Sequence, residues 1–396
     1  MSDRSPAFDA VVIGAGVIGG CVAYLLAKTG LSVCVMEGDA VGSGASGHGH
    51  GVVSLVGNDF KRGPHFELGL EAAQMYRDFA AGLFDDSGVD TLYHELPSLS
   101  LAITEEEEHI FREVMAWQSE YLPLRWIGID ECRELEPRIT REGIGAVVTH
   151  HGQVDGYRLS LAAVTAVERM GGELLMRRAT GLEYDGSRVV AVLHDGGRVA
   201  TRQVVIAGGA WVGEARTWVT YPIPVRPLHG EVLHVRLPGE PLRAFILTAR
   251  HGPLLQRKDG IIMAGSIGGV TMSGMDVHAL HVFDPSNTGP WEFDLTPHPE
   301  GRDHMLTCAV RVMPAIADAE LVAHLAGVRP LSADRLPIIG PVPGKDGVYL
   351  ATGHGTKGIH LAPVTARIVC DMVVGGVAPA RYAPFRPERF AAVALA

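Results

Sequence analysis

Residues 8–37 read FDAVVIGAGVIGGCVAYLLAKTGLSVCVME, which predicts a strand, a glycine turn, a helix and a second strand in direct succession. The run 8–13 is apolar and β-branched, as is typical of a buried parallel strand. Apolar residues at helical spacing follow over 17–28, and Gly30 is suited to end that helix. Residues 31–36 resemble a second strand, so the stretch predicts a βαβ unit and an α/β fold.

The glycine turn carries the pattern G-x-G-x-x-G, formed by Gly14, Gly16 and Gly19. In a dinucleotide-binding unit the first glycine permits the tight turn, the second lets the backbone approach a diphosphate, and the third lets the helix pack on the strand. The diphosphate would meet the helix N-terminus at Val17 and Ile18. Further along, Glu37 and Gly38 lie at the carboxyl end of the second strand. An acid about 20 residues after the glycines can accept hydrogen bonds from an adenosine ribose.

The composition is ordinary for a soluble globular protein and argues against several other classes. It has 396 residues, 47% of them hydrophobic and 20% charged, which allows two domains. A formal net charge of −11 without a basic tract argues against nucleic acid. Five cysteines without a C-x-x-C pair favour reduced thiols in the cytoplasm. The N-terminal apolar run is broken by the glycine turn, so we expect no signal peptide and no membrane span. A homo-oligomer is possible.

A loop rich in glycine and serine, residues 42–51, follows directly after the second strand. Its backbone must pass close to a neighbour, so we expect it at the cofactor. The hydroxyls of Ser43 and Ser46 can donate to phosphate oxygens, and we expect cofactor contacts from Ala45, Gly47, His48 and Gly49. His50 is a candidate catalytic group, although histidines in loops often make structural hydrogen bonds and have no catalytic role.

Several stretches together resemble the D-amino-acid oxidase superfamily of FAD-dependent enzymes, which includes glycine oxidase, sarcosine oxidase and D-amino-acid dehydrogenase. The resemblance begins with the glycine turn, Glu37 and the 42–51 loop. It continues through the helix and strand of 154–175 and through VVIAGGAWVGE at 204–214. It ends in AGVRPLSADRLPIIGPVP and VYLATGHGTKGIHLAP, within 326–363. The match therefore follows the family order through all three thirds of the chain.

The resemblance implies an α/β FAD-binding Rossmann-like domain of the glutathione-reductase type, plus a substrate domain with an antiparallel β-sheet. The implied FAD domain is discontinuous, and comprises residues 1–85, 150–215 and 322–396. The substrate domain would comprise 86–149 and 216–321. Strand patterns support the antiparallel sheet, at 92–103, 142–149, 225–237, 244–248, 254–256 and 261–264. A helix over 105–118 is predicted after a Thr104 cap, and a long irregular insertion over 276–301.

The resemblance also implies further contacts with FAD. Gly208, Gly209 and Trp211 would close over the flavin after the strand that ends at 207. A second glycine turn and helix N-terminus would face the flavin pyrimidine ring, where a positive helix end stabilises the charge added on reduction. The residues implied there are Gly353, Gly355, Thr356, Lys357, Gly358 and Ile359. Gly327 stands where sarcosine oxidase carries the cysteine that bonds FAD, so we expect non-covalent FAD.

Three side chains are implied to act on the substrate. Arg329 matches the arginine that clamps the substrate carboxylate in glycine oxidase and D-amino-acid oxidase, and a planar guanidinium suits a carboxylate because it offers two parallel N–H bonds. Lys357 matches the sarcosine oxidase lysine that also meets the carboxylate. His354 would orient groups beside the flavin. His278 and His281 have a spacing that suits a metal, but no third ligand joins them, so we predict no metal site.

The leading hypothesis is an FAD-dependent amino-acid or amine oxidase or dehydrogenase. It would oxidise the C–N bond of an amino acid or N-substituted amino acid by hydride transfer to flavin N5, giving an imine that hydrolyses to a keto acid. The partners would be a carboxylate-bearing amine substrate and either O₂ or an electron carrier. Oxidation of a 2-hydroxy acid is an alternative. Another is an FAD-holding, partner-dependent subunit of a heteromeric dehydrogenase. An NAD-dependent dehydrogenase is a weaker rival, because both glycine-rich segments favour FAD.

Overall fold

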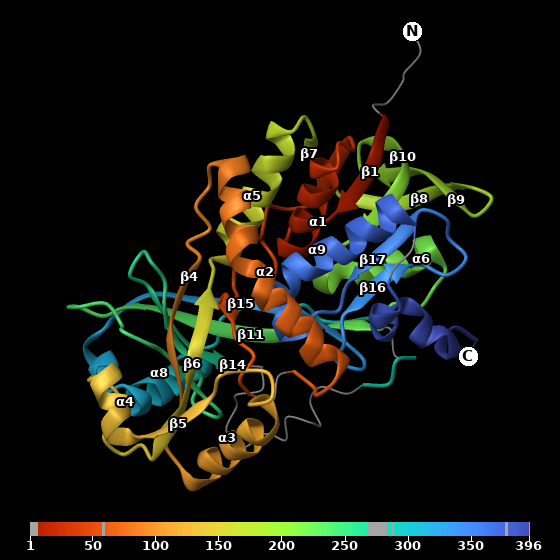
Figure 1. The fold of residues 1–396 in the computed structure, drawn as a ribbon. Helices are drawn as coiled ribbons and strands as arrows, with labels where there is room; N and C mark the ends of the chain where they lie inside the picture. Colours follow the sequence, from red (N-terminus) through yellow and green to blue (C-terminus); the bar gives the residue numbers. More distant parts are fainter. Residues whose placement is uncertain (1–6, 58–59, 268–282, 287–288, 377–378, 396) are drawn as a thin grey trace.

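Two β-sheets organise the molecule (Figure 1). The computed structural model describes residues 7–57, 60–267, 283–286, 289–376 and 379–395. In the first, eight-stranded sheet, β1 (Ala7–Ile13) pairs in parallel with β2 (Val33–Glu37) and with β10 (Gly197–Ile206). Beyond β2 the sheet continues with β7 (Glu173–Met176). Beyond β10 it continues with β17 (Val348–Thr352) and then β16 (Ile338–Pro341). The predicted parallel α/β unit is confirmed.

Three helices cover one face of this sheet: α1 (Val17–Lys28), α5 (Gly156–Arg169) and α9 (Gly358–Gly375). The helix α2 (Pro64–Ser87) packs on α5 and α9 (Figure 1). The predicted bounds of α1 are those observed, and Gly30 follows it with φ +88°. The remaining two strands of the sheet are β8 (Ala179–Asp185) and β9 (Arg188–His194), which form a hairpin in which β9 pairs antiparallel with β10. This hairpin, η1 (Gly209–Ala215) and α6 (Arg216–Val219) pack against the other face of the parallel strands. Apolar side chains of both faces form the largest cores.

The second sheet has nine strands in the order β15-β11-β14-β13-β12-β4-β6-β3, with β5 beside β6. Their bounds are β3 (Val52–Val53), β4 (His94–Ala102), β5 (Arg125–Gly128), β6 (Gly145–Gln153), β11 (Val225–Arg236), β12 (Phe245–Thr248), β13 (Leu254–Gln256), β14 (Ile262–Ile267) and β15 (Glu320–Ser332). The predicted strands are present within a few residues. The sheet is antiparallel except where β12 pairs in parallel with β4.

Helices pack on one face of the second sheet, namely α4 (Ile129–Leu135), α8 (Pro299–Val312) and η2 (Pro314–Asp318). The sequence analysis missed α8, whose first residues fall in the predicted irregular insertion 276–301. A proline at the first helical position has no N–H to lose, so Pro299 begins this helix without penalty. Residues 283–286 and 289–298 are irregular, as predicted. His278 and His281 lie outside the described residues.

The helix α3 (Glu105–Gln118) has the predicted bounds and a capping box at its start. Thr104 Oγ1 accepts a hydrogen bond from Glu107 N at 3.3 Å, and Glu107 Oε2 accepts one from Thr104 N at 3.3 Å. Glu107 is fully buried and also contacts His251 Nδ1 at 3.2 Å. This member of the acidic first turn therefore joins the helix to the second sheet.

A proline within α9 is accommodated by a partner from another helix. Pro363 has no N–H to donate to the carbonyl of Ile359, four residues earlier. The hydroxyl of buried Tyr76, on α2, donates to that carbonyl at 2.6 Å. The helix therefore continues through Pro363 with its carbonyls satisfied. The remaining short 3-10 segments are η3 (Gly355–Lys357), η4 (Ala380–Phe385) and η5 (Pro387–Leu395).

Segments far apart in sequence build each sheet. The first sheet draws on β1 and β2, then on β7 to β10, and finally on β16 and β17, whereas β3 leaves the N-terminal segment to pair with β6 of the second sheet. The domain boundaries given above stay a prediction. Among the described helices, residues 355–375 are long and apolar enough to cross a membrane, with mean hydropathy 1.3, but 61% of that stretch is buried inside the protein. Such burial is typical of a core helix.

Candidate active site

A cavity of about 1000 Å³ is lined by residues of both sheets. On one side it meets the carboxyl ends of β1, β2, β10 and β17, where ligands bind in parallel α/β sheets. On the other side it meets β12 and β15. The wall includes most of the predicted cofactor-binding residues, namely Gly14, Gly16, Val17, Ile18, Glu37, Gly38, Ser43, Ala45, Ser46, Gly49, Gly208, Gly209, Trp211, Gly355, Thr356, Lys357, Gly358 and Ile359.

Steric constraints explain the glycines of the first turn. Gly14 has φ +108°, and a Cβ built on it would lie 2.5 Å from the carbonyl oxygen of Ala207. A Cβ on Gly19 would lie 1.9 Å from the Gly14 carbonyl oxygen. Only glycine therefore allows β1, β10 and α1 to meet this closely. The backbone of this turn is exposed to the cavity as the glycine pattern predicts.

Glu37 joins the ends of two strands at the cavity wall. Its Oε2 accepts a hydrogen bond from Ala15 N at 2.8 Å, and its Oε1 accepts one from Asp39 N at 2.8 Å. Each carboxylate oxygen has a further lone pair for a ribose hydroxyl. Ser46 Oγ accepts a hydrogen bond from Val17 N at 3.0 Å, at the start of α1. Its hydroxyl proton stays available for a phosphate oxygen, so the predicted donation stays a prediction.

The two loop histidines have different surroundings. His48 Nδ1 donates to the Gly44 carbonyl at 2.8 Å, so this ring holds the loop together. His50 lies on the cavity wall, and its Nε2 donates to the Gly265 carbonyl at 2.5 Å. Burial lowers the pKa of His50 to about 4. At neutral pH the ring is uncharged and its Nδ1 is an acceptor.

Trp211 lies on the cavity wall between two irregular segments. Its ring stacks on Phe293 with centroids 5.3 Å apart and planes at 9°. A Cβ on Gly44 would lie 3.1 Å from the same indole, so the 42–51 loop passes directly against it. Trp211 therefore connects that loop to the segment that precedes α8.

The second glycine turn brings three polar side chains to the cavity wall, those of His354, Thr356 and Lys357. His354 is 5% exposed, and its Nε2 lies 3.1 Å from Thr365 Oγ1. Burial lowers the pKa of His354 to about 3, so the ring is neutral, and within the described part of the chain its Nδ1 has no hydrogen-bond partner. Lys357 is 8% exposed and its Nζ lies 5.0 Å from the centre of the Phe60 ring. The N-cap residue of α9 is Lys357, and its side chain makes no capping hydrogen bond to the first turn.

Arg329 lies on the cavity wall, on β15. Its Nη1 donates to the carbonyl of His229, on the neighbouring strand β11, at 3.3 Å. Gly230 lies beneath the guanidinium, since a Cβ built there would lie 1.9 Å from Nη1. A side chain at position 230 would occupy the place of the guanidinium. The pair of strands therefore sets the position of Arg329.

Four predicted cofactor contacts are not among the residues that line this cavity, namely Gly19, Gly47, His48 and Gly353. Their contact with the cofactor stays a prediction. Conversely, the wall contains charged residues that the sequence analysis missed, including Arg178, Arg250 and Arg335. No local pattern marks these arginines, because each reaches the cavity from a different part of the chain.

The parallel sheet, glycine turns and acid at β2 define a dinucleotide-binding flavoprotein fold. Comparison with known proteins gives the family: the family description FAD dependent oxidoreductase matches residues 9–372, and the chain belongs to this family. Glycine oxidase of Geobacillus kaustophilus is 30% identical over 394 residues, which cover 96% of this chain and 97% of that protein. Its crystal structure superposes with a TM-score of 0.86 at 28% identity, covering 97% and 99% of the chains. A hydrogen cyanide synthase subunit of Pseudomonas aeruginosa is 30% identical, covering 98% of this chain and 99% of its own.

The chain is therefore an FAD-dependent oxidoreductase, and its cavity suits that cofactor. Glycine-lined backbone at the start of α1 suits the diphosphate, and the carboxylate of Glu37 suits the ribose. The first turn of α9 and the Nδ1 of buried His354, which has no hydrogen-bond partner among the described residues, offer polar groups to the flavin end. Gly327, at the position where a covalent flavin link is formed in sarcosine oxidase, has no side chain to form one.

Proposed function

We propose that this oxidoreductase oxidises the C–N bond of an amino acid or an N-substituted amino acid. Bound FAD would supply the redox chemistry by accepting a hydride, and the resulting imine would hydrolyse to a keto acid. The observation that carries the proposal is Arg329 on the cavity wall, held by a neighbouring strand. The similarity to proteins described as glycine oxidases supports the same substrate class.

The chain's own residues would bind and orient this substrate. Arg329 would receive the carboxylate through two parallel N–H bonds, and Lys357 would add a second positive charge. Neutral His50 would accept a hydrogen bond from the N–H of the neutral substrate amine through its Nδ1, because Nε2 is already bonded to Gly265. Neutral His354 would orient groups at the flavin end without adding charge. These contacts would hold the α-carbon in one place before hydride loss.

A panel of substrates tests the proposal directly. The purified yellow holoenzyme is mixed without oxygen with D-, L- and N-methyl amino acids and with 2-hydroxy acids, and loss of flavin absorbance is followed. We expect bleaching by one or more amino acids, with ammonia or amine released in proportion to substrate consumed. Bleaching only by hydroxy acids, without amine release, would replace amine oxidation by the 2-hydroxy-acid alternative. Reoxidation by air or only by an added acceptor would then separate an oxidase from a dehydrogenase.

The similarity to a hydrogen cyanide synthase subunit supports a second candidate, a partner-dependent dehydrogenase subunit. That relative is described as a subunit of a synthase. If this candidate is correct, the isolated chain is yellow but no member of the panel bleaches it. Addition of extract from the source cells would then restore bleaching, and the partner would copurify with the chain.

A further inference from the structure

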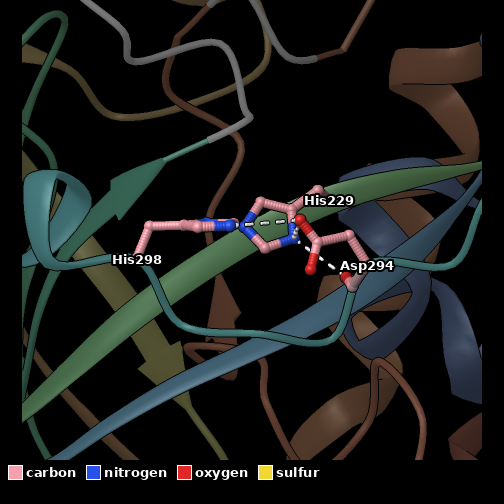
Figure 2. A group of neighbouring side chains, drawn as sticks. All are labelled: His229, Asp294 and His298. Carbon is pink, nitrogen blue, oxygen red and sulfur yellow. Dashed lines mark hydrogen bonds and ion pairs between the residues drawn. The ribbon is translucent and has the colours of Figure 1, made fainter.

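Three side chains outside the proposed substrate contacts converge near the cavity. His229 lies on β11, whereas Asp294 and His298 belong to the segment that precedes α8. Figure 2 shows both imidazoles turned toward the Asp294 carboxylate. Asp294 Oδ2 lies 3.3 Å from His298 Nε2 and 3.9 Å from His229 Nδ1. In the described part of the chain, these three residues form the one group of histidine and carboxylate ligands close enough to hold a metal ion.

A buried carboxylate contacts the other ring nitrogen of each imidazole and so orients both rings. Glu231 is 2% exposed, and its Oε1 lies 2.9 Å from His229 Nε2 and 2.9 Å from His298 Nδ1. Its Oε2 lies 2.6 Å from His324 Nε2, so three histidines surround one acid. Histidines that bind a metal usually bond their second nitrogen to a carboxylate in this way, which sets the ring orientation and tautomer. The nitrogens not used by Glu231 are those that face Asp294.

We propose that His229 Nδ1, His298 Nε2 and Asp294 Oδ2 bind a divalent transition metal of the zinc class, with Glu231 as the group that orients the two imidazoles. Tetrahedral zinc with bonds of about 2.0–2.1 Å places its ligand atoms about 3.3 Å apart. Asp294 Oδ2 lies 3.3 and 3.9 Å from the two nitrogens, and all three ligand atoms lie within 4.8 Å of one another. His229 Nδ1 lies 2.9 Å from the backbone carbonyl oxygen of Asp294, so metal binding would replace this contact and draw the three ligands together. Imidazole and carboxylate ligands suit zinc, and a water molecule would take the fourth position.

The ion would tie a peripheral segment to the sheet that carries the proposed substrate contact. Asp294 follows Phe293, which stacks on cavity-lining Trp211. On the sheet side, the backbone carbonyl of His229 accepts the hydrogen bond from Arg329. Metal binding would therefore hold the segment, the indole and the strand beneath the guanidinium in one arrangement. The three ligands are partly exposed, with His229 at 25%, His298 at 45% and Asp294 at 46%, so an ion can enter from solvent.

Zinc titration of the EDTA-treated holoenzyme tests the site, with flavin absorbance recorded as a check on folding. We expect one Zn²⁺ per chain by calorimetry, a melting temperature that rises with Zn²⁺, and the d–d absorption of bound Co²⁺ in place of Zn²⁺. His298→Ala and Asp294→Asn should each weaken binding at least 10-fold. Glu231→Gln should keep one ion per chain but weaken binding 10- to 100-fold, as loss of an orienting partner does.

A matched control separates this site from ordinary surface histidines. His109 is an exposed histidine that lies 3.4 Å from a single carboxylate, that of Glu113, so His109→Ala should leave the zinc affinity unchanged. The proposal is overturned if the unsubstituted protein binds no more zinc than His298→Ala, or if His109→Ala weakens binding equally. In either case, the group is only a network of ion pairs around Glu231.

Discussion

Substitution of Gly230 by alanine should move the Arg329 guanidinium without removing it. A Cβ at position 230 would lie 1.9 Å from Nη1, 2.2 Å from Cζ and 2.4 Å from Nη2 of that side chain. Gly230 is buried in β11 and is not one of the glycines with positive φ, so alanine fits the backbone. The clash falls on the mobile end of an arginine, which gives way before the strands do.

The expected loss of kcat/KM follows from the distance that the guanidinium must move. Ordinary van der Waals contact with a Cβ begins at 3.4 Å, so the guanidinium must shift by about 1.5 Å (3.4 − 1.9 Å). A misplacement of about 1 Å in a positioning group lowers rates by about 100-fold. We therefore expect kcat/KM for the amino acid substrate to fall about 100-fold, equivalent to about 2.7 kcal/mol of transition-state stabilisation.

Steady-state kinetics on the best substrate of the panel measure this loss, alongside flavin content and melting temperature, which should both be nearly unchanged. Arg329→Ala gives the upper limit, and adding Gly230→Ala to it should cause little further loss, because both act on one contact. Gly213→Ala is the matched control, since a Cβ there meets no atom within 4 Å although its neighbours line the cavity. The assignment of Arg329 as the residue that binds the substrate carboxylate is wrong in either of two cases. In the first, Gly230→Ala keeps kcat/KM within about twofold of the unsubstituted enzyme. In the second, the losses caused by Gly230→Ala and Arg329→Ala add in full in the double variant.

Three further predictions concern the cofactor, α9 and pH. Glu37→Gln should weaken FAD retention, because an amide accepts fewer hydrogen bonds from the ribose and from Ala15; a full flavin complement after dialysis would contradict this role. Tyr76→Phe should lower the free energy of unfolding by about 1–3 kcal/mol in urea, because the Ile359 carbonyl loses its partner; an unchanged midpoint would show that another donor replaces it. Burial lowers the pKa of His151 to about 3, so the unfolded chain binds the extra proton between about pH 6.5 and 3, and stability should fall as pH falls through that window. His151→Gln should reduce this slope by up to about 1.4 kcal/mol per pH unit, and an identical slope would contradict the assignment.

Local sequence patterns were sufficient to predict the cofactor-binding framework. The bounds of α1 and α3 follow from apolar spacing and from end signals at Gly30 and Thr104, all of which act within a few residues. The glycines of the first turn are required by close approach of the backbone, and that requirement is visible in the sequence. The family resemblance added the order of segments, which locates the second glycine turn.

Turns, helix caps and strand alternation could be predicted from the sequence, because these preferences depend on neighbours along the chain. The meeting of distant groups became visible only in the folded protein: Tyr76 with the Ile359 carbonyl, Glu231 with three histidines, and Gly230 beneath Arg329. Each of these contacts depends on the registers and packing of whole elements, which no local pattern specifies. The framework is therefore encoded locally, and the chemistry of the site is set by contacts between segments.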